Sequence, residues 1–317
     1  MITPALSFIA TANAVVHCGA TPVFADVDPP TCNLDPQAAE SAITPRTKAI
    51  VHVHQLGLPA TIAAFQEISR RHGIAIVEDA ACALGTRYRG RPIGGHSQLV
   101  CFSFHPRKVI STGEGGMVLT NSDEYAQRLR LLRQHGMSVP DTARHGATQL
   151  VIEQYVRVGY NYRMSDVHAA LGLAQMDRLD ELVRQRRALA AQYDRAFANN
   201  PLLLTPFVPE YAEPNYQSYI LQLTDDAPIA RDALLRALLA RGVAAKPGIM
   251  TIHREPAYRG YRAGPLPHTE RIGDRSLLLP LYPQMTEAEQ QQVIATVRAS
   301  LDALLEPAGC GSQEGRA

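Results

Sequence analysis

The sequence contains little cysteine, almost no net charge and no long hydrophobic run. Its five cysteines are scattered along 317 residues, and no two of them form a C-x-x-C pair. This spacing argues against a disulfide framework or a zinc ribbon, and it favours a reducing, cytoplasmic setting. Lysine and arginine total 31, and aspartate and glutamate total 30. Such an even balance of charge favours neither a nucleic acid nor an anionic membrane as the partner.

No stretch approaches 18 uninterrupted apolar residues, so a membrane-spanning helix is not expected. Residues 5–16 are apolar enough to imitate a signal peptide. However, no lysine or arginine precedes them and Asn13 interrupts the run, so no secretion signal is predicted. His52 and His54 would share one face of a strand, but no third ligand stands near them, and no metal site is expected.

The sequence does contain enough apolar material, 46% of its residues, for a core of about two domains. In the first half, short apolar runs alternate with helical patterns. Strands are predicted at 22–27, 48–53, 74–77, 99–104 and 117–120, and helices at 62–72 and 124–134, closed by Gly73 and Gly136. This alternation predicts an α/β domain with a mostly parallel sheet flanked by helices.

Residues 166–198 form one long helical pattern, which Asn199-Asn200-Pro201 interrupt. The arginine-rich stretch 184–187 inside it is interpreted as a solvated helix face, with a phosphate patch as the alternative. A strand at 218–223 and helices at 228–241 and 286–305 follow, and Thr286 and Glu289 suit a capping box. We therefore predict a large domain over 1–198, a smaller C-terminal α+β domain over 199–310 and a flexible tail over 311–317.

Asp79 ends a predicted buried strand, in the run Glu78-Asp79-Ala80-Ala81-Cys82. Ligands of open α/β sheets collect at the carboxyl ends of the strands. Asp79 is therefore a candidate for orienting a cationic ligand, and a helix N-cap is the structural alternative.

Ser103 to Lys108 follow the next predicted strand and precede the glycine-rich turn 113–116. A lysine beside a hydroxyl group and such a turn suggests a lysine nucleophile with a phosphate nearby. A solvated loop lysine is the alternative. The segment is not the G-x-x-x-x-G-K-[ST] loop of nucleotide hydrolases.

A third candidate, Gly159 to Asp166, precedes the long helical pattern. Ser165 or Asp166 can cap that helix, whereas the tyrosine, asparagine and arginine residues fit a loop that binds something anionic or aromatic.

Seven segments occur in an order that resembles the sugar aminotransferases of DegT/DnrJ/StrS type. They are SFIATANA (7–14), GATPVF (19–24), ITPRTKAI (43–50), EDAA (78–81), SFH (103–105) with Lys108, GEGG (113–116) and GYNYR (159–163). The resemblance covers nearly the whole chain. It implies a pyridoxal 5'-phosphate (PLP) enzyme of the aspartate-aminotransferase fold, that is, PLP-dependent transferase fold type I.

The resemblance also implies roles for individual residues. Lys108 would form the Schiff base with PLP and move a proton between the substrate α-carbon and C4′ of the cofactor. Asp79 would pair with the pyridinium nitrogen, so that the ring accepts carbanion charge. Ser103 would donate to the cofactor phosphate, and Phe8 would lie on the ring face. Cys82 stands where many relatives carry Gln or His near the phenolic oxygen.

Asn161 resembles the residue that reaches the cofactor phosphate from the neighbouring subunit, which implies a homodimer with shared active sites. Arg163 and His253 are candidates for contacts with the sugar substrate or the amino donor. For His253, a solvent-facing loop position is the alternative.

Within this resemblance, Lys108 favours an aminotransferase over a dehydratase, because related sugar dehydratases carry His at this position. The implied reaction moves an amino group, with glutamate as the donor, onto a keto group of a nucleotide-linked sugar for polysaccharide or antibiotic biosynthesis.

Relatives carry a helix and a Ser-Gly-Thr loop upstream of the Ser7-Phe8 region, where the loop cradles the PLP phosphate at a helix N-terminus. No such loop stands near residue 1. We therefore expect this chain to lack that segment, and a catalytically impaired or regulatory relative is the alternative function.

Overall fold

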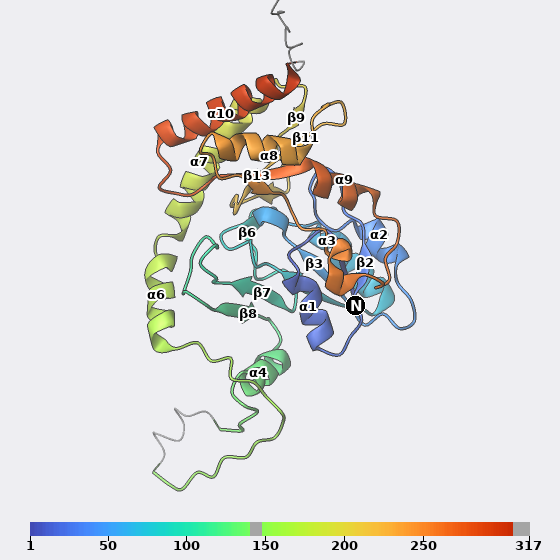
Figure 1. Ribbon diagram of the computed structural model, residues 1–317. Coiled ribbons are helices and arrows are strands. Elements are labelled where there is room, and N and C mark those ends of the chain that lie inside the picture. Colours follow the sequence, from blue (N-terminus) through green and yellow to red (C-terminus); the bar gives the residue numbers. More distant parts are fainter. Residues whose placement is uncertain (140–147, 307–317) are drawn as a thin grey trace, which may run out of the picture.

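The computed structural model describes residues 1–139 and 148–306, which build a large and a small sheet (Figure 1). The large sheet has six strands in the order β2-β1-β3-β4-β7-β8. Its strands are β1 (Ile2–Pro4), β2 (Val23–Ala25), β3 (Ala49–Val53), β4 (Ala75–Asp79), β7 (Val100–Ser103) and β8 (Gly116–Leu119). All neighbours pair in parallel except β8, which runs antiparallel to β7. The predicted mostly parallel sheet is therefore confirmed.

Helix α3 (Ile62–His72) shows how a helix of this part buries an apolar stripe. It buries Ile62, Phe65 and Ile68, and it ends at Gly73, which adopts a left-handed φ of 63°. This matches the predicted helix and its closing glycine. The other elements are α1 (Ala10–His17), α2 (Pro36–Ser41), α4 (Asp123–Leu132), η1 (Gln55–Gly57) and a three-stranded sheet of β5 (Arg87–Tyr88), β6 (Arg91–Pro92) and β10 (Ala212–Glu213).

The long helix predicted over 166–198 is wrong, because two helices replace it. Helix α6 (Asp166–Met176) begins at the N-cap Ser165, and α7 (Leu179–Phe197) follows after Arg178 leaves the helical conformation with ψ near 2°. Acidic residues Asp180 and Glu181 occupy the first turn of α7, where the helix dipole favours them. The apolar pattern continues across the break, which is why periodicity alone does not reveal it.

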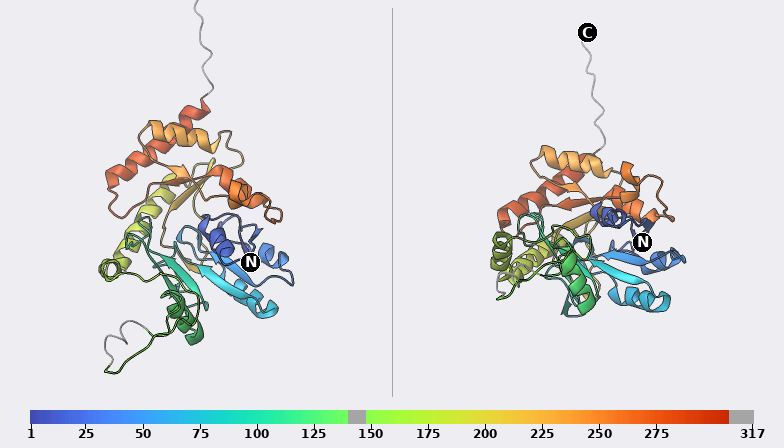
Figure 2. Two further views of the ribbon diagram at one scale, coloured as in Figure 1. Left: turned by 60° about the horizontal axis from the view of Figure 1, so that its bottom comes forward. Right: turned by 90° about the horizontal axis from the view of Figure 1, so that it is seen from below.

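The small sheet is antiparallel, with the order β12-β13-β11-β9. Its elements are β9 (Leu203–Leu204), β11 (Tyr219–Leu223), β12 (Lys246–Pro247), β13 (Ser276–Leu279), α8 (Arg231–Ala240), α9 (Pro267–Arg275), α10 (Glu287–Leu305), η2 (Ile252–Arg254) and η3 (Pro256–Tyr258). The predicted capping box of α10 forms between Thr286 and Glu289. In Figure 2 these elements, in yellow, orange and red, lie together on one side of the large sheet.

Helix α7 packs against both parts of the molecule. Leu182 and Val183 belong to an apolar cluster with β7, whereas Tyr193 and Phe197 belong to the cluster under the small sheet. The domain boundary at 198/199 stays a prediction, and the predicted tail 311–317 lies outside the described residues. None of the described helices has the length and apolar composition that a membrane crossing requires.

Arg186 of α7 is buried, so the interpretation of residues 184–187 as a solvated face is wrong for this residue. Its guanidinium donates to the backbone oxygens of Tyr216, Gln217 and Leu281. The buried guanidinium is thus hydrogen-bonded to backbone oxygens.

Two histidines and a glutamate are fully buried beneath the large sheet. Nε2 of His54 donates to Oε2 of Glu78 at 2.9 Å, because Nδ1 of His54 accepts from the Ala60 N–H at 3.0 Å. His52 stacks on Phe65, and neither of its ring nitrogens has a hydrogen-bond partner. Burial, with a smaller effect of His54, lowers the pKa of His52 to about 3. Among the described residues, no three His, Cys, Asp or Glu side chains are grouped so as to hold a metal ion.

We expect replacement of His52 by leucine to flatten the acid sensitivity of the fold. Below pH 6.5 the unfolded chain binds a proton that folded His52 excludes down to pH 3, so stability falls as the pH falls through this window, by up to about 1.4 kcal/mol per pH unit. Urea unfolding at pH 7, 6 and 5 measures the slope. The exposed His17→Gln variant is the control, and an unchanged slope in His52→Leu would contradict the expectation.

Candidate active site

The carboxyl ends of β4 and β7 carry Asp79 and Ser103, and the two strands are neighbours in the parallel part of the sheet. The end of β1 leads through Ser7 and Phe8 into α1 at the same edge. Parallel pairing therefore brings together three segments that are spread in sequence from Ser7 to Ser103. This is the edge at which ligands of open α/β sheets bind.

Asp79 is held by two donors. Its Oδ2 accepts from the Thr11 hydroxyl at 2.8 Å, and its Oδ1 accepts from the Ala81 N–H at 3.1 Å. The Thr11 hydroxyl also lies 3.0 Å from the Ser7 hydroxyl. No helix begins within residues 80–86, so the N-cap alternative for Asp79 is wrong. The carboxylate is oriented by α1 and its own turn, and it remains half-buried at the edge of the sheet.

Lys108 lies in a loop whose two ends are joined by backbone hydrogen bonds of Phe104. The Phe104 N–H donates to the Gly115 oxygen at 2.9 Å, and the Phe104 oxygen accepts from the Thr112 N–H at 3.0 Å. A side chain at Gly115 would place its Cβ only 2.5 Å from the Thr112 hydroxyl, so the turn requires glycine. Farther along the loop, the Ser111 N–H donates to the Gln175 side chain of α6.

The amino group of Lys108 contacts a thiol. Its Nζ donates to Sγ of Cys82 at 3.2 Å, and the lysine is half-buried, so the solvated-lysine alternative is wrong. Burial raises the pKa of the Cys82 thiol, the charge of Lys108 lowers it and the charge of Asp79 raises it further. Asp79, Cys82 and Lys108 thus form one electrostatic group, in which the thiol stays protonated at neutral pH.

Ser103 and Phe8 lie beside this group. The Ser103 hydroxyl accepts from the His105 N–H at 3.3 Å and is half-buried. The Phe8 side chain is 67% exposed, and Phe8 precedes Ile9, the N-cap of α1. Both positions are open to a ligand, and the specific roles that the resemblance implies for them stay predictions.

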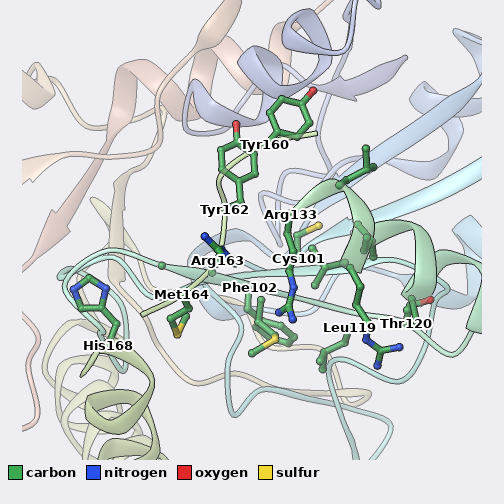
Figure 3. Close-up of a pocket in the computed structure, with 18 of the residues that line it drawn as sticks. Cys101, Phe102, Leu119, Thr120, Arg133, Tyr160, Tyr162, Arg163, Met164 and His168 are labelled. Atoms are coloured by element: carbon green, nitrogen blue, oxygen red, sulfur yellow. The ribbon is translucent and has the colours of Figure 1, made fainter. Parts of the chain in front are cut away.

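Arg163 lies at a cavity of about 1000 Å³ that is lined by β7, β8, α4 and a segment including Tyr160, Tyr162 and Met164 (Figure 3), and Asn161 belongs to the same segment. Strand β8 is the edge of the sheet and all four of its residues are exposed. The rings of Tyr160 and Tyr162 stack with their centroids 4.8 Å apart, and Asn161 forms an isolated bridge with Gln134. The roles predicted for Asn161 and Arg163 are not tested by these contacts.

His253 lies in η2, where its Nε2 is 3.2 Å from Oε1 of Glu270. The side chain is only 15% exposed, so the solvent-facing alternative is wrong. Its Nδ1 is buried without a partner in the described residues. A contact of His253 with substrate or donor stays a prediction.

Sequence reasoning did not single out Thr11 or Asn215. Thr11 belongs to the SFIATANA segment, which contains no charged residue. Nothing in that segment therefore indicates a pairing of Thr11 with Asp79. Asn215, which donates to the Cys82 oxygen, is 133 residues away from it, and no local pattern signals that contact.

Comparison with known proteins gives a consistent result. The model of the DegT/DnrJ/EryC1/StrS aminotransferase family matches residues 1–298. The chain is 38% identical over 303 residues to the spore coat polysaccharide biosynthesis protein SpsC of Bacillus subtilis, covering 94% of this chain and 78% of SpsC.

Solved structures agree with this match. The structure is similar to that of PseC of Helicobacter pylori, an aminotransferase of pseudaminic acid biosynthesis, with a TM-score of 0.88 and 29% identity over 95% of this chain and 79% of PseC. DesI, solved in the presence of its TDP-sugar product, gives a TM-score of 0.84 and 34% identity over 95% of this chain and 74% of DesI. These similarities confirm the expected fold.

We expect Cys82 to react slowly with iodoacetamide at pH 8, because burial raises the pKa of its thiol. Alkylation should be about tenfold slower or more than at the exposed Cys18. Peptide mass spectrometry after timed labelling measures both rates, and buried Cys32, with a pKa raised to about 12, gives the slow reference. Equal rates at Cys82 and Cys18 would contradict the burial of the thiol.

Proposed function

The chain belongs to the DegT/DnrJ/EryC1/StrS aminotransferase family, and we propose that it transfers an amino group from glutamate to the keto group of a nucleotide-linked sugar. Enzymes of this family are PLP-dependent sugar aminotransferases. The observation that carries the proposal is the contact of Lys108 with Cys82 beside Asp79 at the carboxyl edge of the sheet. The relation to DesI, solved with a TDP-sugar product, supports the substrate class.

The residues at this edge suit PLP in chemical type. The Asp79 carboxylate, fixed by Thr11 and Ala81, offers a negative charge for a protonated ring nitrogen. The Lys108 amine suits the aldehyde carbon, and the half-buried Ser103 hydroxyl suits the phosphate. The exposed Phe8 offers an aromatic surface for the ring. When bound, PLP supplies an electron sink for the carbanion formed at the substrate carbon.

The chain's own residues then perform the proton chemistry. With PLP bound, Lys108 would take the proton from the amino-bearing carbon of the donor and deliver it to C4′ of the cofactor, a role that needs an amine held near the reacting atoms. The protonated Cys82 thiol, 3.2 Å from Nζ, adds no negative charge next to this amine. Arg163, at the neighbouring cavity, carries the charge that a carboxylate or diphosphate would require.

We propose further that two copies of the chain assemble around this site. Apolar side chains of α6 and of the segment before it are exposed, namely Leu150, Ile152, Tyr155, Val156, Val158, Val167, Leu171, Leu173 and Met176. Monomeric proteins seldom expose so many large apolar residues in one region. Asn161 lies in the same region, which supports a site shared between subunits. The four cysteines of the described residues are all free, which supports a cytoplasmic location.

Replacement of Lys108 by alanine should abolish the visible absorbance of cofactor attached to this lysine. We expect transamination to fall by about 10²- to 10⁴-fold or more, the range for a lost acid–base group. The chain contains only three lysines, so the exposed Lys246→Ala variant is a matched control. Spectra with PLP and a coupled glutamate assay measure both properties.

Three outcomes of this experiment are informative. An unchanged spectrum in Lys108→Ala would contradict the assignment of this lysine. A wild-type protein without a cofactor band would contradict the proposed function as a whole. A protein that binds PLP and dimerises but does not turn over would favour the regulatory alternative.

Replacement of Leu173 by aspartate should weaken the proposed dimer by about tenfold or more, because an unpaired carboxylate in an apolar interface is strongly unfavourable. Leu239 on α8 is exposed to a similar degree and lies far from α6, so Leu239→Asp is the control. Sedimentation equilibrium measures the dimer constant. Equal constants for the two variants would contradict an interface at α6.

A further inference from the structure

The segment Glu213–Gln217 contacts the backbone on both sides of the Cys82–Lys108 pair, although it is more than 100 residues away from either residue. We propose that Asn215 and Gln217 are positioning residues that hold Cys82 and Lys108 at their separation of 3.2 Å. This inference rests on the proposed function, which assigns the pair to the reaction.

Asn215 fixes the thiol side of the pair. The residue is fully buried, and its side-chain amide donates to the backbone oxygens of Cys82 and Leu84, both at 2.8 Å. Its Oδ1 accepts from the Gln217 N–H at 2.8 Å. A Cβ at Gly57 would lie 1.8 Å from this Oδ1, so the chain keeps a glycine where Asn215 needs the space. Both hydrogens of the amide are therefore used on the turn that carries Cys82.

Gln217 fixes the lysine side of the pair. Its Nε2 donates to the backbone oxygen of Arg107, the residue before Lys108. Its Oε1 is buried without a partner in the described residues, which is unfavourable for stability. The unpaired Oε1 makes Gln217 a poor choice for the stability of the fold alone. The hydrogen bond from its Nε2 to the Arg107 oxygen explains the residue better.

Helix α7 holds the segment from its other side. Arg187 donates to the oxygens of Glu213 and Pro214 at 3.0 and 2.8 Å. Arg186 donates to the oxygens of Tyr216 and Gln217 at 3.2 and 3.3 Å, and burial lowers the pKa of this arginine to about 10.

Tyr216 adds a second unfavourable feature, a positive φ of 50°. This segment of five residues thus contains a left-handed tyrosine and accepts hydrogen bonds from a buried arginine of α7. The side-chain amides of Asn215 and Gln217 in that segment donate to backbone oxygens next to Cys82 and Lys108. Rigid support of this kind is what a precise reacting geometry requires.

The test uses Gln217→Met, which keeps the length of the side chain and removes its donor. The control is Gln222→Met, because Gln222 is a buried glutamine of β11 whose amide lies near Cys32 and not near the Lys108 loop. Two readouts need no cofactor. They are the rate of Cys82 alkylation and the NMR signal of Lys108 after ¹³C-reductive methylation, which the presence of only three lysines makes assignable.

In Gln217→Met we expect alkylation of Cys82 to accelerate by about tenfold and the Lys108 signal to move toward those of Lys48 and Lys246. With PLP, kcat should fall by about tenfold while KM stays constant, because the variant misplaces the acid–base group and leaves substrate binding intact. The melting temperature should match that of Gln222→Met. If Gln217→Met does not fold, Arg187→Gln loosens the same segment from the surface and should give the same changes in smaller size.

The proposal is overturned if folded Gln217→Met keeps the wild-type alkylation rate and Lys108 signal, or if Gln222→Met changes them equally. These readouts come from protein without cofactor. A wild-type chain that shows no cofactor band therefore refutes the proposed function and leaves the test of Asn215 and Gln217 intact.

Discussion

The parallel pairing of β4 between β3 and β7 is the constraint on which the site depends. It brings the ends of strands that are far apart in sequence to one edge, and it turns Asp79 toward the loop that carries Lys108. The hydroxyl of Thr11 reaches Asp79 only because β1 enters the same sheet and delivers α1 to that edge. A shift in the register of β4 by one residue would turn Asp79 to the opposite face of the sheet and remove its carboxylate from the site.

Neighbouring carboxylates on β4 have opposite environments, because successive side chains of a strand point to opposite faces. Glu78 is enclosed with His54 and His52, and the hydrogen bond from His54 offsets the effect of burial on the pKa of the glutamate. Asp79 is half-buried and is held by a hydroxyl and a backbone N–H. One acid is thus enclosed in the core as a hydrogen-bonded carboxylate, whereas the other lies at the edge of the sheet, where a ligand can reach it.

Local signals in the sequence indicate many of the strands and helices, though not β1, α1 or α2. Short apolar runs located the strands, Gly73 located the end of α3, and Thr286 with Glu289 located the start of α10. Apolar periodicity does not reveal the break between α6 and α7, because the periodicity continues through it. Asp180 and Glu181 are the sequence signal for the start of a new helix.

Long-range partners could not be read in the same way. Nothing near Arg186 shows that its charge is buried against backbone oxygens, and nothing near Asn215 shows that its amide supports Cys82. Such contacts depend on how distant segments pack, whereas a strand end and a glycine-rich turn make Asp79 and Lys108 candidates, to which the family resemblance then adds specific roles.

Strand β8 has a consequence for how the protein behaves while it is being made. It is an edge strand with its backbone groups unpaired on one side, and Met117, Val118 and Leu119 are exposed along it. A strand of this kind is a template onto which another extended chain can add. Newly synthesised copies therefore face a competition between correct assembly and irregular strand-to-strand association, and a higher concentration of unassembled chain shifts that competition toward aggregation.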